Sequence, residues 1–189
     1  MKKLMMNKRN IIMFAALIAI GVFGRLLPHA WNFTPLIATT IFAGVYLGKK
    51  YAFFLPIATM LISDIFIGFY DPKIMLSVYF SFAVAGFIGY RFAKNKKINN
   101  LALSAFVSST IFFLVTNAAV WLFGTMYVSG FQGLIQSYLA GLPFYRNMML
   151  GDITYTLILF GTYEMSLGLV KRYKTQKNSL PISTGINVL

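Results

Sequence analysis

The feature that most constrains this chain is a series of long apolar stretches separated by short clusters of Lys and Arg. The stretches cover residues 11–27, 35–48, 51–70, 74–92, 101–123 and 143–170. Charged residues make up 11% of the chain, whereas soluble domains carry about 25%. A chain this apolar cannot cover its hydrophobic surface with its own polar residues, so its solvent must be lipid. The sequence predicts an all-α membrane protein, a bundle of about six transmembrane helices.

Proline, glycine and charged residues mark the ends of the predicted helices. Residues 35–48 are short for a full span, and residues 124–142 are less apolar than the stretches around them. We expect a loop over 124–142 with a short extra helix, amphipathic or re-entrant, at about 131–140. The last helix is expected to begin near Pro143, because proline suits the first turn. The predicted organisation is one transmembrane bundle over 1–172 and a short, disordered cytoplasmic tail over 173–189.

The distribution of the 17 Lys and Arg residues predicts the orientation. With six spans, fourteen of them fall on one side of the membrane, and only Arg25, Lys73 and Arg146 fall on the other. Because positive residues gather in cytoplasmic loops, we expect both chain ends in the cytoplasm and the protein in the cell (cytoplasmic) membrane. Residues 11–27 could pass for a signal peptide, but the run is long for one, so we expect a retained helix.

Composition also argues against several kinds of site. The net charge of +13 would suggest nucleic acid if it formed one patch on a soluble domain, but here the cations act as topology signals and no nucleic-acid partner is expected. There is no Cys, so disulfides and thiolate metal sites are excluded. With a single His and four carboxylates, we predict neither a metal site nor a cofactor.

Polar residues within the spans are the strongest functional signal. A charged group in hydrocarbon costs about 2.5–3.5 kcal/mol on insertion scales, so it usually marks a bundle interior, a cavity or a pathway. With a rise of about 1.5 Å per residue, Asp64, Asn117 and Asp152 all fall in the outer half of their helices. Residues at the outer helix ends and in the first outer loop share this depth. The candidate substrate-binding residues are Arg25, His29, Trp31, Asn32, Asp64, Asn117, Trp121, Arg146, Asn147, Asp152 and Tyr155.

Two interpretations of these residues remain open. Arg25 and Arg146 could pair with Asp64 and Asp152 only to hold the bundle together, and the Trp residues could be interfacial aromatics. Alternatively, the shared depth indicates one polar cavity that faces outward. Because the charges of the outer half nearly cancel, a zwitterionic or neutral polar substrate fits such a cavity better than a strongly anionic one.

At this point the chain resembles known membrane proteins. The six spans, the small residues Ala15 and Ala19 four apart on the first helix, and the stretch 62–68 resemble the substrate-binding S components of energy-coupling factor (ECF) vitamin transporters. More specific motifs resemble an uncharacterised family of proposed transport proteins related to them. These motifs are Arg25-Leu26-Leu27-Pro28-His29, Asn32-Phe33-Thr34-Pro35, Ser63-Asp64, residues 112–117 with Trp121, and Leu142-Pro143-Phe144 with Gly151-Asp152. The resemblance covers roughly residues 11–171.

This resemblance implies that the chain binds a small nutrient near its outer surface, with the first outer loop as part of the gate. An S component has no ATPase and docks on a separate transmembrane coupling subunit that carries two ATP-binding subunits. Consistently, the chain lacks the phosphate-loop signature G-x-x-x-x-G-K-[ST]. The resemblance places the docking surface at Ala15 and Ala19. The intramembrane charges match no vitamin-specific pattern, so the substrate stays open.

The sequence therefore predicts a substrate-binding membrane subunit of an ECF-type uptake transporter for a vitamin-like nutrient, and not an enzyme. One alternative is a membrane-embedded enzyme that acts on a lipid or isoprenoid. Such an enzyme would need a catalytic pair of Asp or His residues, whereas Asp64, Asp152 and His29 stand alone in the sequence. The other alternative is a structural or assembly protein of the envelope.

Overall fold

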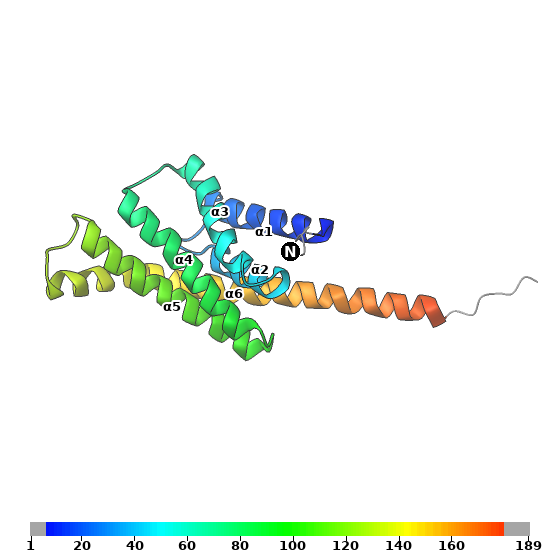
Figure 1. The fold of residues 1–189 in the computed structure, drawn as a ribbon. Coiled ribbons are helices and arrows are strands. Elements are labelled where there is room, and N and C mark those ends of the chain that lie inside the picture. The colour runs from blue at the N-terminus through cyan, green and yellow to red at the C-terminus, as the bar shows by residue number, and fades with distance from the viewer. Residues whose placement is uncertain (1–6, 180–189) are drawn as a thin grey trace, which may run out of the picture.

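A computed structural model describes residues 7–179, and this part of the chain folds into six α-helices without a strand (Figure 1). The all-α prediction is therefore confirmed. Four of the helices, α1, α4, α5 and α6, are long and apolar enough to cross a membrane, as expected of a multi-pass membrane protein. The helices are α1 (Lys8–Leu26), α2 (Leu36–Leu47), α3 (Tyr51–Ile67), α4 (Pro72–Ala93), α5 (Ile98–Phe123) and α6 (Phe131–Ser179).

The distribution of side chains is that of a protein whose solvent is lipid. Large apolar side chains cover the outside of the bundle, among them Ile12, Phe54, Ile65, Phe66, Leu76 and Phe80. Small polar side chains lie in the interior, among them Thr39, Thr40, Ser104, Ser108 and Ser109. Many interior hydroxyls donate to a carbonyl of their own helix, as Thr40 does to Leu36 O at 2.7 Å. This local bonding satisfies them where no bulk water is present.

Helix α2 forms the centre of the bundle instead of a full span. It has 12 residues and buries every one from Leu36 to Gly44, and it contacts all five other helices. At about 1.5 Å per residue it is about 18 Å long, short of a hydrocarbon core of about 30 Å. Its close packing depends on glycine, since a methyl group at Gly86 of α4 would overlap Thr40. Helix α3, with 17 residues, is also shorter than a typical span.

Helix α6 differs from the expected loop, short helix and last helix. It is one helix of 49 residues that contains Pro143, so the expected extra helix over 131–140 is its first part. A proline inside a helix removes one backbone hydrogen bond, and contacts with α5 hold this part in place. Ser137 Oγ donates to Asn117 O at 2.8 Å, and Tyr138 OH donates to Leu114 O at 2.9 Å.

The same helix also continues beyond the expected end at residue 170, as far as Ser179, and its last turns project from the bundle (Figure 1). The first residues of the expected tail are therefore helical: the polar residues after Val170 continue α6 beyond the bundle. The rest of the tail, 180–189, and two cations of the topology signal, Lys2 and Lys3, lie outside the described residues.

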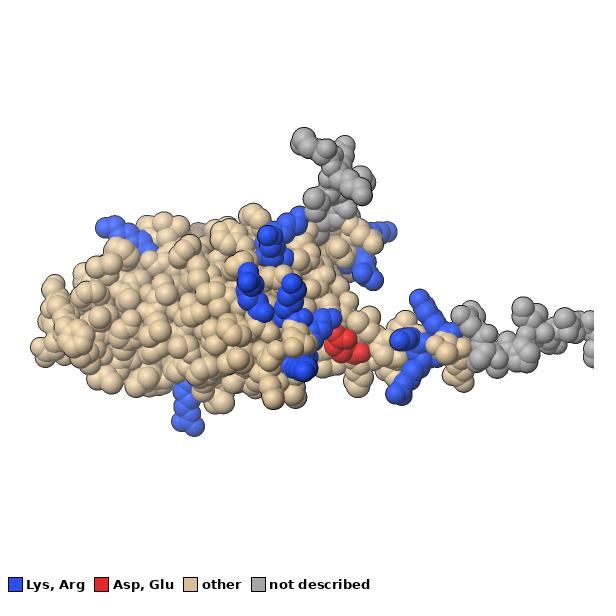
Figure 2. Space-filling model, turned by 60° about the horizontal axis from the view of Figure 1, so that its bottom comes forward, with Lys and Arg blue, Asp and Glu red and all other residues tan. Residues whose placement is uncertain are grey.

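Most of the Lys and Arg side chains visible in Figure 2 gather at one end of the bundle. This basic end comprises the start of α1, the α2–α3 turn with Lys49 and Lys50, and the α4–α5 loop. Glu164 of α6 lies at the same level, because its Oε1 is 2.9 Å from the Nζ of Lys96. Lys96 also lies 4.2 Å from the ring centroid of Tyr46, near the end of α2. Arg25 and the α3–α4 turn belong to the opposite end.

Candidate ligand-binding site

A buried ion pair joins α1 and α3 at the end of the bundle opposite the basic end. Arg25 lies in the last turn of α1, and its Nη1 is 2.8 Å from Oδ1 of Asp64 in α3. The same nitrogen donates to the hydroxyl of Ser63. From α4, the hydroxyl of Tyr79 donates to Oδ2 of Asp64 at 2.6 Å. Both oxygens of the Asp64 carboxylate therefore have donors, and its charge is compensated by the guanidinium.

Asp152 of α6 is buried in a different way. Its side chain is 1% exposed, and Ser109 of α5 donates to its Oδ2 at 2.7 Å. Among the side chains that the structure describes, residues 7–176, it has no ion pair. Arg146, one of its two expected partners, is exposed one and a half turns earlier on the same helix. The structure therefore supports pairing for Asp64 but leaves Asp152 without a cation.

Arg25 and Asp152 line one cavity of about 270 Å³. Its other polar walls come from the α1–α2 loop, the α3–α4 turn and α5, namely Asn32, Thr34, Tyr70 and Thr116. The apolar walls are Met60, Val78, Phe82, Phe112 and Met148. Segments far apart in the sequence thus converge on one space that combines a few polar groups with apolar and aromatic surface, which is typical of small-molecule sites.

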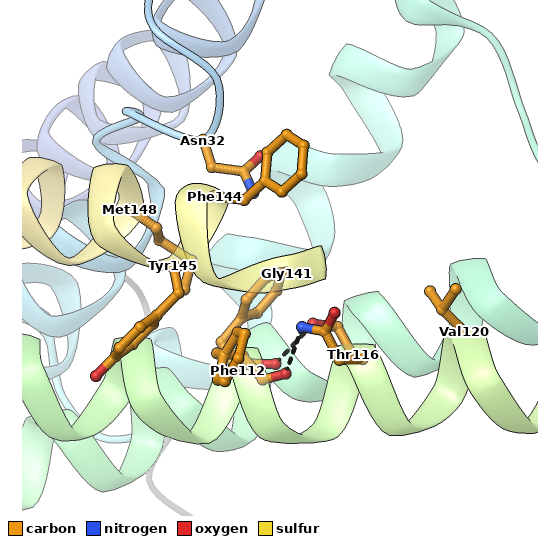
Figure 3. Close-up of a pocket in the computed structure, with 10 residues that line it drawn as sticks. Asn32, Phe112, Thr116, Val120, Gly141, Phe144, Tyr145 and Met148 are labelled. Carbon is orange, nitrogen blue, oxygen red and sulfur yellow. Dashed lines mark hydrogen bonds between the residues drawn. The ribbon is translucent and has the colours of Figure 1, made fainter. Parts of the chain in front are cut away.

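A second cavity, of about 150 Å³, adjoins the first and shares Asn32, Phe112, Thr116 and Met148 with it. Figure 3 shows this second cavity, with Phe144, Tyr145 and Met148 from α6 and Phe112 and Thr116 from α5. Asn117 also lines it, and the Asn117 amide donates to Phe113 O at 2.8 Å, which leaves its carbonyl oxygen free to accept.

Gly141 sets the approach of α6 to Asn117. A methyl group at this position would overlap the Asn117 amide, so a residue with a side chain would push the two helices apart or displace the amide. On the far side of the cavities, Gly151 packs against Phe33, where a methyl group would lie 3.2 Å from the Phe33 Cα. Glycine therefore fixes both the α5–α6 and the loop–α6 contacts around the cavities.

Tyr70 supplies a neutral hydroxyl to the larger cavity. It lies in the turn between α3 and α4, outside both helices. Partial burial of the ring, which is 40% exposed, and after it the negative charge of Asp64, raise the pKa of Tyr70 to about 12, and the positive charge of Arg25 opposes this shift. The phenol is therefore protonated across the physiological pH range and can donate a hydrogen bond to a bound molecule.

The structure brings only some of the predicted residues to the cavities. Arg25, Asn32, Asn117 and Asp152 line one or both of them, and Asp64 lies directly behind Arg25. The other candidates lie around them, because depth along a helix does not determine which way a side chain faces. The residues that line neither cavity are His29, Trp31, Trp121, Arg146, Asn147 and Tyr155.

Each of the four ring side chains outside the cavities has a partner elsewhere. His29 is exposed, and its Nδ1 is 2.5 Å from Leu27 O. Trp121 donates from Nε1 to Val128 O at 3.3 Å. Tyr155 packs on Phe33, with ring centroids 5.5 Å apart. Trp31 is 71% exposed, yet its ring stacks on Phe144 at 5.4 Å. Since Phe144 lines the smaller cavity, Trp31 covers a wall of the site from outside.

Sequence reasoning missed several residues of the site. Tyr79 and Ser109 bind the two buried carboxylates, and Thr116 lines both cavities. Hydroxyl groups can satisfy themselves on their own helix, so a Ser, Thr or Tyr inside an apolar stretch gives no distinct signal. The one available hint was position, because Thr116 is adjacent to Asn117 in the sequence.

Ala15 and Ala19, the predicted docking residues, lie on an exposed face of α1. Leu17, on the opposite side of the same helix, is 3% exposed and packs into the core. The two alanines therefore contribute nothing to the packed interior of this chain. They form a surface on which the backbone of α1 is accessible to lipid or to another helix.

Comparison with known proteins gives a family and nothing beyond it. No curated protein and no solved structure matches the chain. The family match spans residues 5–176 and thus includes both cavities, helices α1 to α5 and all but the last three residues of α6. This chain belongs to DUF6580, a family of unknown function.

Proposed function

We propose that this chain is the solute-binding subunit of a membrane transporter for a small polar nutrient, of the ECF S-component type. The observation that carries the proposal is the cavity between Arg25 and Asp152. Charged side chains from α1 and α6 line one cavity within an apolar bundle. Such groups are costly in a membrane unless they pair with one another or serve a cavity or pathway, and Asp152 has no cation partner among the described residues.

The size and the walls of the cavities support a small ligand. Sites for drug-sized molecules have volumes of about 300–1,000 Å³, and each of the two adjoining cavities, of about 270 and 150 Å³, is smaller than that. The polar groups are few and come from separate elements, which suits the recognition of one small molecule. An extended lipid chain would need a longer apolar channel.

The orientation that we propose places this site toward the outside of the cell. The Lys and Arg residues gather at the opposite end of the bundle (Figure 2), and such a surplus favours the cytoplasmic side. Both chain ends would then be cytoplasmic. The α1–α2 loop would act as a gate, since it supplies Asn32 to both cavities and places Trp31 over Phe144.

Energy for uptake would come from a partner, because the chain has no phosphate-loop signature. We propose that the exposed alanines Ala15 and Ala19 of α1 dock on a separate transmembrane coupling subunit that carries the ATP-binding subunits. Small residues let two helix backbones approach closely in lipid, and this face of α1 is not covered by the chain itself.

Native mass spectrometry of the protein in lipid nanodiscs tests the proposed binding function. The wild type is expected to release a bound small molecule, and Asn117→Ala is expected to reduce its occupancy because Asn117 lines the smaller cavity. Asn147→Ala is the matched control, since Asn147 lies on the adjacent helix α6 and lines neither cavity. A wild type that carries no small molecule other than lipid, even after expression in rich medium, contradicts the proposal.

A further inference from the structure

We infer that the ligand of this site is a small organic cation whose ammonium group pairs with Asp152. The inference rests on the proposed function and narrows its substrate class. The sequence alone favoured a zwitterionic or neutral ligand, because the charges of the outer half nearly cancel in a simple count. The structure shows that these charges do not cancel within the site itself.

The positive charge of Arg25 is already compensated by the carboxylate of Asp64. Its Nη1 lies 2.8 Å from Oδ1 of Asp64, and the buried Asp64 carboxylate is held in place by Tyr79 through a 2.6 Å hydrogen bond. Arg25, which lines the cavity, and Asp64, which lies behind Arg25, therefore form a neutral unit. Arg146 does not compensate the site either, because it is exposed and lines neither cavity.

Asp152 is the carboxylate that this arrangement leaves uncompensated. It is 1% exposed and lines the larger cavity. Its Oδ2 accepts from Ser109 at 2.7 Å, while its Oδ1 has no hydrogen-bond donor among the side chains that the structure describes. A buried carboxylate stays ionised when it has donors for its oxygens and an opposite charge nearby, and otherwise takes up a proton. A ligand with an ammonium group in the cavity would supply both.

The remaining walls fit the rest of such a ligand. Phe82 and Phe112 pack against each other with ring centroids 4.1 Å apart, and both line the same cavity as Asp152. Aromatic faces attract cations, and Met60 and Met148 add an adaptable apolar surface. At the other side of the cavity, the Arg25 nitrogens outside the ion pair have no acceptor within the described chain and suit a hydroxyl or carbonyl oxygen of the ligand.

A matched pair of probes tests the charge of the ligand. Phenethylamine and 2-phenylethanol are similar in size, but the first carries an ammonium group where the second carries a hydroxyl group. Their dissociation constants are measured by ligand-observed NMR with the wild type, Asp152→Asn and Asp152→Glu in nanodiscs, with empty nanodiscs subtracted. The wild type is expected to bind the amine at least about tenfold more tightly, because only the ammonium adds an opposite charge to its hydrogen bond with the carboxylate.

The two variants show whether Asp152 is responsible. Asp152→Asn keeps the shape and an acceptor for Ser109 and is expected to bring the ratio of the two constants to about one. Asp152→Glu keeps the charge and is expected to retain the preference for the amine. Size-exclusion profiles that match the wild type show that each variant is folded.

The outcomes separate this inference from the function on which it rests. Equal binding of both probes by the wild type, or a preference for the amine that survives Asp152→Asn, overturns the inference while a solute-binding cavity stands. If neither probe binds the wild type at millimolar concentration, the inference is overturned, whereas the solute-binding function is decided by the native mass spectrometry of the wild type.

Discussion

Tyr79 and Asp64 are joined by a hydrogen bond of 2.6 Å from the phenol to Oδ2 of the carboxylate. The bond ties α4 to α3, and through the ion pair of Asp64 with Arg25 it ties both helices to the end of α1. Three helices thus meet at one buried carboxylate at the edge of the larger cavity. The position of the Arg25 guanidinium in the cavity wall depends on this network.

Arg25→Met is expected to destabilise the protein strongly, because it leaves the buried Asp64 carboxylate without a cation. Removing one partner of a buried ion pair costs about 3–5 kcal/mol. Arg146→Met is the matched control, since Arg146 is exposed, and it is expected to change the free energy of unfolding by less than about 0.5 kcal/mol. Thermal and denaturant unfolding in detergent measure both.

The double variant Arg25→Met with Asp64→Asn shows whether the charge is the cause. It removes the stranded carboxylate and is expected to recover most of the lost stability. If the double variant is as unstable as Arg25→Met alone, the loss comes from packing of the Arg25 side chain and the ion pair has no special part in it.

Gly141→Ala is expected to weaken ligand binding, because the added methyl group would overlap the Asn117 amide and move it from the smaller cavity. Gly161→Ala on the same helix meets no atom within 4 Å and is expected to stabilise slightly, by up to about 1 kcal/mol, through helix propensity. The amount of co-purified small molecule and the unfolding temperature are measured for both. Equal behaviour of the two variants contradicts the assigned role of Gly141.

Tyr70 is expected to lose its proton only near pH 12, against an ordinary value of 10.0, because burial and the charge of Asp64 oppose the phenolate. Since the pKa is higher in the folded state, the folded protein is stabilised relative to the unfolded chain below pH 10, and this contribution is lost as the pH rises through 12. The difference in absorbance at 295 nm between the wild type and Tyr70→Phe follows this group alone. A difference curve with its midpoint near pH 10 contradicts the influence of partial burial and of Asp64 on Tyr70.

Much of the fold is predictable from the sequence, because lipid demands long apolar helices and the charge clusters between them mark their ends. The sequence does not predict which helix is buried within the bundle. Helix α2 looks like any other apolar stretch, yet it is surrounded by protein, since the interior of a membrane protein is about as apolar as its surface. Pro143 was expected to begin a helix, but it lies inside α6, where contacts with α5 compensate for the lost hydrogen bond.

For the site, the sequence predicts how deep in the membrane each candidate residue lies, but not in which direction its side chain points. Asn117 and Trp121 lie one turn apart and were both predicted to bind the substrate, yet only Asn117 lines a cavity, while Trp121 donates to Val128 O. The pairing of carboxylates also depends on tertiary contacts. Nothing in the sequence distinguishes Asp64, which forms an ion pair with Arg25, from Asp152, which accepts a hydrogen bond from Ser109.

Cysteine labelling in intact cells tests the central claim that the cavity is a solute site open to the outside. The chain has no Cys, so Thr116→Cys introduces a single thiol into a residue that lines both cavities. The probe is the membrane-impermeant thiol reagent 2-(trimethylammonium)ethyl methanethiosulfonate, added before or after the cells are permeabilised. Ser104→Cys, at a fully buried position of the same helix outside the cavities, and Asn95→Cys, exposed in the α4–α5 loop, are the controls.

The account predicts that Thr116→Cys reacts in intact cells, that Asn95→Cys reacts only after permeabilisation, and that Ser104→Cys reacts in neither case. The labelling of Thr116→Cys is also expected to slow when the medium contains the solute released by the wild type. Reaction of Thr116→Cys only after permeabilisation would contradict the outward opening, and absence of reaction in both conditions would contradict an accessible cavity at this position.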